Sequence, residues 1–428
     1  MAMYSYYITK QTANFIKPNT RYRMPIFYIL PKIHKVGVPG RPIVSAVGSI
    51  TENISEFLTL CIQPLVPKLR SYVRDTKHFV SIIRKLPTQS NDAILVSADV
   101  SSLYTNIPHN EGIEACKHYM KKYKHELPEF TPNEGIIHML LLFVLENNYF
   151  QFLNQIYLQI MGTAMGTKVA PPYAALFLGL LEETHIFEKY PNLITIFLRF
   201  LDDIFFIWNH GEEKLHSFFK YLNSIHPTIK FTYEYSRNEI NFLDTTVYFD
   251  TITGELKTKL FIKHTDTRTF LHYDSYHPSH TKESIVYSQG LRYRMITTDD
   301  GVLHNELKEL KSNLLLRGYP SQLITEQLNK VIHISQNELI EGRIPVTKNK
   351  ANANKSTCKP QKKETNLLPF IIPYHKLLLP LKQLIHKHWF IIEENDMLKT
   401  MFPNKPFLSF TRHRNIQDHL ISSKLKEE

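Results

Sequence analysis

The sequence predicts an α+β fold, because two different periodicities divide the chain. Residues 93–263 hold short apolar runs separated by turns, which is the pattern of β-strands, whereas the flanking regions show the wider spacing of amphipathic helices. Apolar residue types make up 43% of the 428 residues, so a sizeable buried core is expected. No stretch approaches the roughly 18 consecutive apolar residues of a membrane span, and the N-terminus lacks a signal-peptide pattern. We therefore expect an intracellular protein with no membrane partner.

The chain is basic, with a formal net charge of +11. An excess of lysine and arginine suits a polyanionic partner such as nucleic acid, although a merely soluble basic protein would have the same composition. The three cysteines (Cys61, Cys116 and Cys358) share no metal-ligand or redox spacing. Neither a zinc site nor a disulfide framework is therefore predicted, which fits a reducing compartment.

Shifts in composition predict five segments. They are an aromatic, basic N-terminal region (1–92), a strand-rich central region (93–263), a helical region (264–344), a lysine-rich linker nearly without apolar side chains (345–365) and a small basic C-terminal module (366–428).

Two aspartates stand in the middle of an apolar hairpin. The runs on either side of Asp202 and Asp203 predict two strands with these carboxylates at the turn, and the apolar run 93–100 predicts a buried strand that carries Asp99 near its end. If the two ends meet, three carboxylates converge and need a cation. Mg²⁺, or Mn²⁺ in its place, is expected, because it takes oxygen ligands and can serve an in-line phosphoryl transfer. The alternative is an ordinary exposed hairpin with an Asp-Asp turn.

The residues around Asp99 read SADVSSLYTNIP (97–108) and resemble the first palm motif of reverse transcriptases. The resemblance implies that Asp99 binds metal and that the backbone carbonyl of Val100 also meets the ion. It implies further that Tyr104 lies under the sugar of the incoming nucleotide, where it would clash with a 2′-hydroxyl and so select deoxynucleotides. A core tyrosine after a strand is the alternative.

The RFLDD stretch (199–203) resembles the catalytic hairpin of the same enzymes. The resemblance implies that Asp202 is a direct metal ligand and that Asp203 supports it. Phe200 stands where tyrosine is common, and the loss of that hydroxyl leaves the carboxylates intact.

The stretch MGTAMGTKVAPPYAALF (161–177) combines two glycines with the start of a helix predicted over 168–187. It resembles the second palm motif, whose loop supports the nascent base pair next to a helix N-terminus that favours anions. The resemblance implies that Met165 and Gly166 contact the nucleotide. A glycine loop before a core helix is the alternative.

Upstream, the turn-rich hairpin of residues 30–45 carries Lys32, Lys35 and Arg41. It resembles the finger motif that contacts the triphosphate, where arginine offers a planar fork and lysine a point charge. Lys32 and Arg41 are the chosen dNTP contacts and Lys35 is secondary. A solvated basic hairpin would show the same pattern.

Two further motifs follow the catalytic hairpin. INFLD (240–244) resembles the hairpin that grips the primer end, which implies primer contacts for Phe242 and Leu243. IKFTYE (229–234) lies where the fourth palm motif is expected, so Lys230 is a candidate general acid toward pyrophosphate. The alternative for Lys230 is a solvated lysine at the rim of a strand.

In the helical region, amphipathic helices are predicted near 279–294, 300–317 and 320–332, with a break at residues 318–320. Three short helices with a tight turn are typical of a helix-turn-helix unit. The pattern would serve equally as the thumb of a polymerase, as an independent DNA-reading module or as simple packing.

Several stretches together resemble Penelope-like retroelements. They are FYILPKIHK (27–35), SADVSSLYTNIP (97–108), MGTAMGTKVAPPYAALFLG (161–179), RFLDD (199–203), KHTDTRTFLHYDSYHP (263–278) and FLSFTRHRNIQDHLISSKL (407–425). The resemblance implies a reverse transcriptase, an RNA-directed DNA polymerase with a right-hand fold. Residues 1–92 would form the fingers, 93–263 a palm with an antiparallel sheet and 264–344 a helical thumb, and the C-terminal module would be a connector.

The same resemblance implies an RNA template, a DNA primer and dNTPs as partners, and the nucleus as the compartment. In many such elements the connector leads into a GIY-YIG endonuclease, of which this sequence shows no sign. We therefore expect an endonuclease-lacking or truncated copy that does not nick DNA. The alternative to an active enzyme is a decayed or repurposed copy that binds nucleic acid. The oligomeric state is not predicted.

Overall fold

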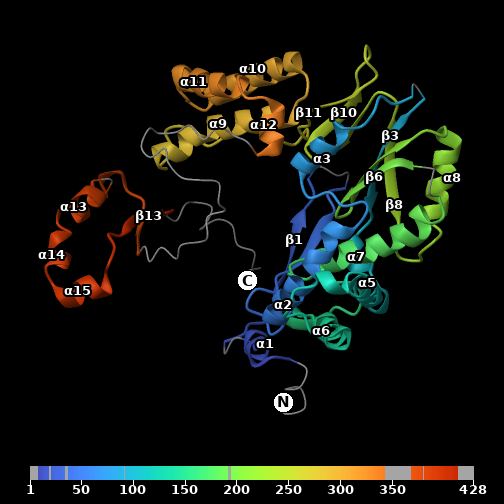
Figure 1. The fold of residues 1–428 in the computed structure, drawn as a ribbon, viewed down its shortest axis with the longest axis horizontal. Helices are drawn as coiled ribbons and strands as arrows, with labels where there is room; N and C mark the ends of the chain where they lie inside the picture. The colour runs from blue at the N-terminus through green and yellow to red at the C-terminus, as the bar shows by residue number, and fades with distance from the viewer. Residues whose placement is uncertain are drawn as a thin grey trace. The chain divides into compact units, whose positions relative to one another are not determined.

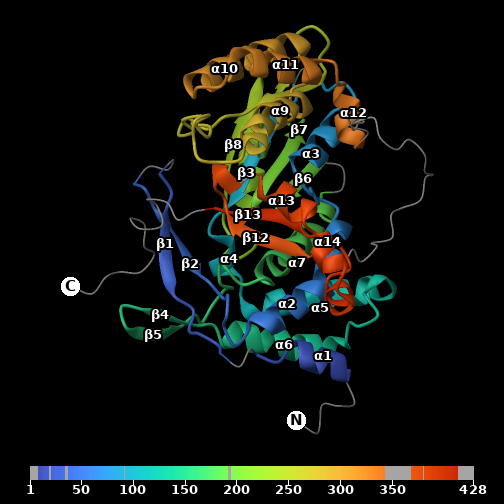
Figure 2. The same ribbon diagram turned by 90° about the vertical axis from the view of Figure 1, so that its left-hand side faces the viewer.

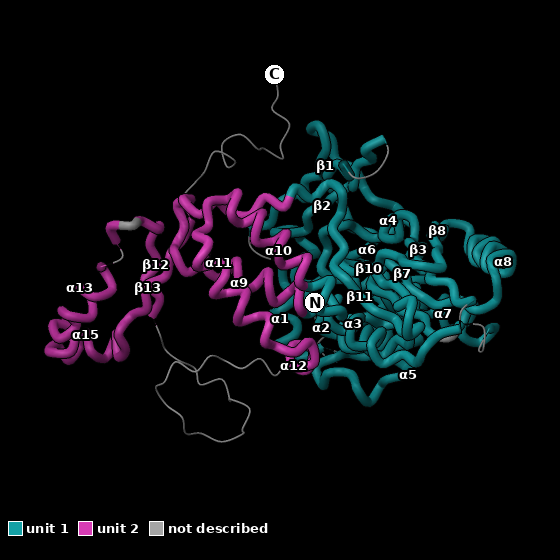
Figure 3. Tube along the Cα trace, turned by 90° about the horizontal axis from the view of Figure 1, so that it is seen from above, with its two compact units in different colours: residues 1–267, 295–303 teal, residues 268–294, 304–428 magenta. Residues whose placement is uncertain are grey.

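The computed structural model describes residues 8–18, 21–33, 37–90, 92–190, 194–342, 368–378 and 380–412 (Figure 1). Two compact units divide the chain: unit 1 is residues 1–267 with 295–303, and unit 2 is residues 268–294 with 304–428 (Figure 3). The predicted N-terminal and central segments thus belong to one unit. The predicted linker 345–365 lies outside the described residues. No described helix has the length and apolar character needed to span a membrane.

The predicted α+β class is confirmed, and an antiparallel sheet forms the centre of unit 1. Its strand order is β6 (Ile194–Phe200), β7 (Asp203–Trp208), β3 (Ile94–Val100) and β8 (Phe231–Ser236). The strand predicted at 93–100 and the hairpin around the aspartate pair are both present, and every neighbouring pair of strands is antiparallel.

Alternation along β3 and β7 buries both faces of this sheet. Ile94, Val96 and Phe206 belong to one hydrophobic cluster, whereas Leu95 and Phe205 belong to a second. Because successive side chains of a strand point to opposite faces, the two clusters lie on opposite sides of the sheet. Such two-sided burial explains why the strands read as nearly continuous apolar runs.

Helices of unit 1 cover the face of the first cluster, and α7 packs on α5, which packs on α6 (Figure 1). The helix predicted over 168–187 is present as α7 and continues into a π-helical turn. The described helices of this unit are α1 (Lys10–Phe15), α2 (Glu52–Ile62), η2 (Gln63–Lys68), α3 (Thr76–Ile83), α4 (Leu103–Asn106), α5 (His109–Lys122), η3 (Lys124–Glu126), α6 (Glu134–Glu146), α7 (Ala170–Glu182), η4 (Glu183–Phe187) and α8 (Glu212–Leu222).

Smaller sheets flank the central one. Two hairpins, β1 (Phe27–Pro31) with β2 (Gly40–Val44) and β4 (Tyr149–Phe152) with β5 (Gln155–Leu158), lie side by side (Figure 2). A bridge between Ile26 and Gln151 joins them. The third sheet has the order β11 (Leu256–Leu260), β10 (Thr245–Phe249) and β9 (Glu239–Phe242).

The helices predicted from amphipathic spacing are present, together with one that was not predicted, and most of their residues belong to unit 2. They are α9 (Ser279–Ile296), α10 (Asp300–Leu316), α11 (Ser321–Ile332) and the unpredicted α12 (Gln336–Glu341). Gly290 of α9 lies against Leu328 and Val331 of α11, where a Cβ would stand 3.0 to 3.1 Å from their side chains and would require them to shift slightly. Short helices such as α12 offer too few turns for a periodicity to stand out.

The C-terminal module contains a parallel pair of strands, β12 (Pro369–Pro373) and β13 (Phe407–Thr411). Helices η5 (Lys376–Leu378), α13 (Leu381–Lys387), α14 (Phe390–Glu393) and α15 (Asp396–Met401) lie between them in the chain. Parallel strands need such a crossover, which is why this module alternates between strand and helix.

Candidate active site

A cavity of about 560 Å³ in unit 1 gathers residues from separate stretches of the chain. Its size suits a small-molecule substrate. The residues singled out from the sequence that line it are Lys32, Arg41, Asp99, Val100, Tyr104, Met165, Gly166 and Asp202. The β1–β2 hairpin, the stretches around Asp99 and Gly166 and the aspartate hairpin thus meet at one place.

The sheet register brings the carboxylates together. Asp99 of β3 is the direct partner of Asp203 of β7, and directly opposed residues of an antiparallel pair share one face of the sheet. Asp202 precedes Asp203 at the turn and lines the cavity with Asp99. Like charges at opposed positions repel each other. A bound cation would remove that repulsion.

Backbone geometry holds the aspartate turn in an uncommon conformation. Leu201 has a φ of 56° and Ser102, which follows β3, has a φ of 51°. The carbonyl oxygen of Asp202 accepts a hydrogen bond of 3.2 Å from the Val100 amide. Left-handed conformations of residues other than glycine persist only where surrounding structure imposes them, and they gather at functional sites.

The donor atoms of this site fit Mg²⁺ or Mn²⁺. Carboxylate oxygens are the ligands that hard divalent cations prefer, and Mg²⁺ is commonly bound by one or two carboxylates together with substrate phosphates. Asp99 and Asp202 provide such a pair. Among the described residues, no group of three His, Cys, Asp or Glu side chains is arranged to hold an ion by itself. The predicted third carboxylate, Asp203, does not line the cavity.

Tyr104 lines the cavity and is close enough to both Asp202 and Arg41 for their charges to act on its phenol. Burial raises the pKa of its phenol to about 12; the negative charge of Asp202 adds to the rise and the positive charge of Arg41 opposes it. The phenol is therefore neutral at physiological pH. Its ring also packs against the first hydrophobic cluster. Tyr104 is therefore partly a core residue, as in the alternative interpretation, and it also lines the cavity.

The glycine loop of residues 161–167 connects two walls of the cavity. The Thr163 amide donates a 2.6 Å hydrogen bond to the Tyr104 carbonyl oxygen, and the Val44 amide donates a 3.0 Å bond to the Met165 carbonyl oxygen. Gly162 (φ 74°) and Gly166 (φ 136°) have conformations that favour glycine. A Cβ on Gly162 would overlap the Tyr104 carbonyl oxygen, and one on Gly166 would overlap that of Val44.

The cationic residues come from the β1–β2 hairpin. Arg41 belongs to β2 and pairs with Leu30 of β1, while the Lys32 amide, just past β1, donates to the Pro39 carbonyl oxygen at 2.9 Å. Both side chains line the cavity. Lys35, the secondary candidate, lies outside the described residues.

The other predicted contacts lie apart from this cavity. Phe242 is only 3% exposed and packs against Phe79 and Phe205, so its side chain is a core residue, and the primer contact at this position stays a prediction. Leu243 forms the following turn with a φ of 53°. Lys230 donates to the carbonyl oxygens of Asn223 and His226 at 2.7 and 2.9 Å, which engages the ammonium group that a general acid would use.

Two residues of this region were not predicted. Lys168 lines the cavity and pairs with Glu56 at 2.6 Å and with Glu52 at 3.5 Å. Arg199 lies buried beneath the aspartate turn. Lys168 stands within the stretch 161–177, and its position next to the glycine loop was the signal that could have identified it. A buried arginine inside an apolar strand gives no sequence pattern from which its partners could be predicted.

A family described as the animal helix-turn-helix domain matches residues 269–329, which include α9, α10 and most of α11. This match supports the helix-turn-helix unit predicted for the segment. It covers well under half of the chain and identifies no family for the whole. No curated protein sequence matches the chain.

Several solved polymerase structures are similar to the chain. Telomerase from Candida albicans in complex with a TWJ fragment of telomeric RNA matches at 12% identity and a TM-score of 0.48, over 77% of this chain and 60% of that one. The RNA-dependent RNA polymerase of a human picobirnavirus matches at 12% identity and a TM-score of 0.48, over 75% and 65%. The BmCPV RNA-dependent RNA polymerase at its elongation state matches at 13% and 0.43, over 68% and 26%.

This chain spans less than two thirds of the length of each of these polymerases. All three TM-scores are below 0.5, so the likenesses by themselves assign no activity to it.

Proposed function

We propose that this chain is an RNA-directed DNA polymerase, a reverse transcriptase of the Penelope-like kind. It would join dNTPs to the 3′ end of a DNA primer on an RNA template. The observation that carries the proposal is that one cavity is lined by the cations Lys32 and Arg41, by the carboxylates Asp99 and Asp202, and by Tyr104. The charges of Asp202 and Arg41 act on the Tyr104 phenol in opposite directions. A triphosphate needs cations at its phosphates, a metal-binding site at the reacting phosphorus and a surface for its sugar.

Each residue would have a definite role. Lys32 and Arg41 would bind the triphosphate oxygens, arginine through its planar fork and lysine as a point charge. Asp99, Asp202 and the Val100 carbonyl would hold Mg²⁺ or Mn²⁺, with Asp203 as a supporting charge. When bound, the ions would stabilise the attacking and leaving oxygens of an in-line displacement. The ring of Tyr104 would exclude a 2′-hydroxyl.

The Penelope-like assignment rests on the ordered series of sequence stretches quoted above, and the helix-turn-helix match at 269–329 falls on the segment expected to be the thumb. In this proposal β1–β2 belongs to the fingers, the central sheet to the palm and α9–α11 to the thumb.

Primer extension tests the proposal. Purified chain would be given an RNA template annealed to a DNA primer, dNTPs and Mg²⁺ or Mn²⁺. We expect extension by the native chain and a loss of at least about 100-fold in Asp99→Asn and Asp202→Asn, because each substitution removes charge stabilisation worth several kcal/mol. Asp92→Asn is the matched control, since that aspartate side chain is 92% exposed and away from the cavity.

Equal extension by native chain and Asp202→Asn would contradict the site. No extension on any RNA template, together with RNA binding that weakens steeply with salt, would favour instead the repurposed nucleic-acid-binding protein.

A further inference from the structure

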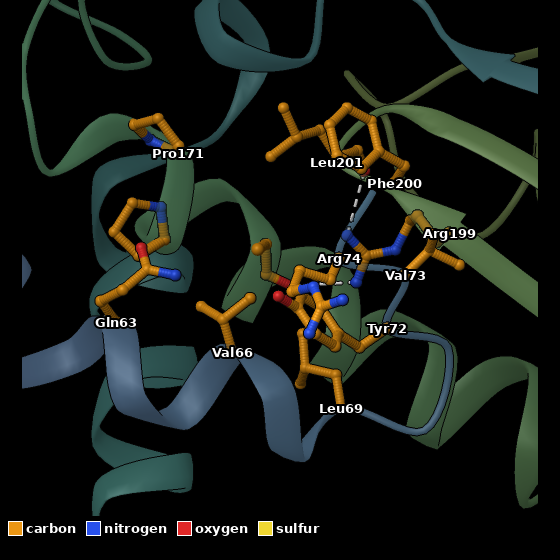
Figure 4. A pocket seen from close by; sticks show the side chains of 12 residues that line it. Gln63, Val66, Leu69, Tyr72, Val73, Arg74, Pro171, Arg199, Phe200 and Leu201 are labelled. Carbon is orange, nitrogen blue, oxygen red and sulfur yellow. Dashed lines mark hydrogen bonds between the residues drawn. The ribbon is translucent and has the colours of Figure 1, made fainter. Parts of the chain in front are cut away.

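Arg199 lies buried directly beneath the aspartate turn, with only 3% of its surface exposed. Its guanidinium donates to both carboxylate oxygens of Glu182, through Nε and, at 3.2 Å, through Nη2. Nη2 also donates to the Ala175 carbonyl oxygen at 3.1 Å. The remaining Nη1 donates to the Leu201 carbonyl oxygen at 3.0 Å (Figure 4).

Both partners of this ion pair are themselves held. Glu182 of α7 is 5% exposed and accepts a 2.5 Å hydrogen bond from the Ser71 hydroxyl. The Arg199 amide donates to the Ser71 carbonyl oxygen at 2.6 Å, and the Val73 amide donates to the Arg199 carbonyl oxygen at 2.9 Å. The guanidinium is therefore held in one orientation, because main-chain groups fix Arg199 on one side and the Glu182 carboxylate binds it in a bidentate manner on the other.

The turn above it needs such support. Leu201 has a left-handed conformation (φ 56°), and it lines two cavities, the site of about 560 Å³ and a smaller one of about 170 Å³ (Figure 4). Packing around Leu201 is therefore open on both of these sides. The β6–β7 pairing of Phe200 with Asp203 closes the turn. Two further hydrogen bonds orient its carbonyl groups: Arg199 donates to the Leu201 carbonyl oxygen, and the Val100 amide donates to the Asp202 carbonyl oxygen.

We propose that Arg199 is a positioning residue, which holds the strained Leu201–Asp202 turn so that the Asp202 carboxylate faces the cavity. Glu182 and the main chain at Ser71 keep Arg199 in place. The inference rests on the proposed polymerase function. An arginine is required because a planar guanidinium can serve Glu182, Ala175 and Leu201 at once, whereas a lysine ammonium is a single point that cannot span all three acceptors.

The test uses two substitutions that avoid an unpaired buried charge. Arg199→Lys keeps the positive charge and loses the fork. The double variant Arg199→Met/Glu182→Leu replaces the whole pair with apolar side chains, which folded proteins tolerate far better than the loss of one partner. Ser71→Ala is the control, because it removes one bond to Glu182 and leaves the bond from Arg199 to Leu201.

We expect kcat of primer extension to fall by about 10- to 100-fold in both test variants, as for a small misplacement of a reacting group. KM for dNTP should change little, because the triphosphate contacts remain. Ser71→Ala should stay within about threefold of the native chain, the range of a weakened indirect contact. If the role of Arg199 were purely structural, the test variants would melt at a lower temperature but would not show a fall in kcat at constant KM.

A second measurement does not depend on activity. Hydrogen–deuterium exchange of a peptide that covers residues 198–205 should accelerate in both test variants, while a peptide from α5 exchanges as in the native chain. An inactive native chain would overturn the polymerase proposal yet leave this readout informative. Unchanged exchange at the turn in the folded double variant would overturn the positioning role, as would an unchanged kcat where the native chain is active.

Discussion

Tyr104 is the residue on which the choice of sugar would depend. Its ring lines the cavity beside Asp202 and Arg41, and burial holds its phenol neutral. We predict that Tyr104→Ala relaxes discrimination against ribonucleotides by about 10- to 100-fold, the range expected when a pocket gains room for a small group. The measurement is the ratio of kcat/KM for dNTP to that for rNTP.

Tyr104→Phe is the matched control, because it keeps the ring and removes only the hydroxyl. It should discriminate as the native residue does. Since the pKa of the phenol is about 12, the native ratio should also stay constant between pH 7 and about 9, where the group does not titrate. A ratio that changes as much in Tyr104→Phe as in Tyr104→Ala would assign the effect to the hydroxyl.

Among the elements, the glycine loop of residues 161–167 determines how the walls of the cavity meet. Gly166 has a φ of 136°, and a side chain there would overlap the Val44 carbonyl oxygen at the end of β2. We predict that Gly166→Ala lowers the free energy of unfolding by about 3 kcal/mol, through backbone strain and overlap together. It should also raise KM for dNTP, since the loop is displaced from the β1–β2 hairpin.

Gly211→Ala separates the two causes. Gly211 has a φ of 76°, a ψ of 165° and open space around it, so its substitution should cost only the conformational strain, about 2 kcal/mol. Urea unfolding measures both variants. An equal loss in the two would mean that the contact with Val44 is unimportant.

For the molecule as a whole, buried thiols and phenols make stability depend on alkaline pH. Burial raises the pKa of Cys61 to about 12 and raises that of Cys116 beyond it. Their ordinary pKa is near 9, so above that pH the unfolded chain loses protons that the folded chain retains. The free energy of unfolding should therefore decrease as pH rises from about 9, by up to about 1.4 kcal/mol per pH unit for each thiol.

Chemical denaturation between pH 8 and 10 measures this slope. Cys61→Ala/Cys116→Ala should decline less steeply than the native chain, whatever its stability at pH 8. The buried phenols of Tyr119 and Tyr173, whose pKa values burial also raises, add a smaller decline near the upper limit. A slope unaffected by the double substitution would mean that the thiols are accessible in the folded state.

The sequence determined the local elements well, for physical reasons that act over short range. An apolar run of strand length predicted β3, the apolar runs around Asp202 and Asp203 predicted a hairpin, and one pair of prolines marked the start of α7. Each is a property of neighbouring residues, namely the side-chain period and backbone restriction. The candidate site residues could be predicted for the same reason, because they stand inside short motifs. They are the aspartates, Tyr104, Lys32 and Arg41.

Tertiary structure alone decided which of these residues meet. It placed Lys32 and Arg41 with Asp99 and Asp202 around one cavity, and it buried the side chain of Phe242 in the core. It also joined Arg199 to Glu182, and Glu182 to Ser71, which stands 111 positions away. A buried ion pair of this kind depends on how α7, β6 and the chain at Ser71 pack. The local side-chain periodicity predicts the strand that carries Arg199, with the aspartates at its end. It does not predict how that strand packs, because packing depends on residues far away in the sequence.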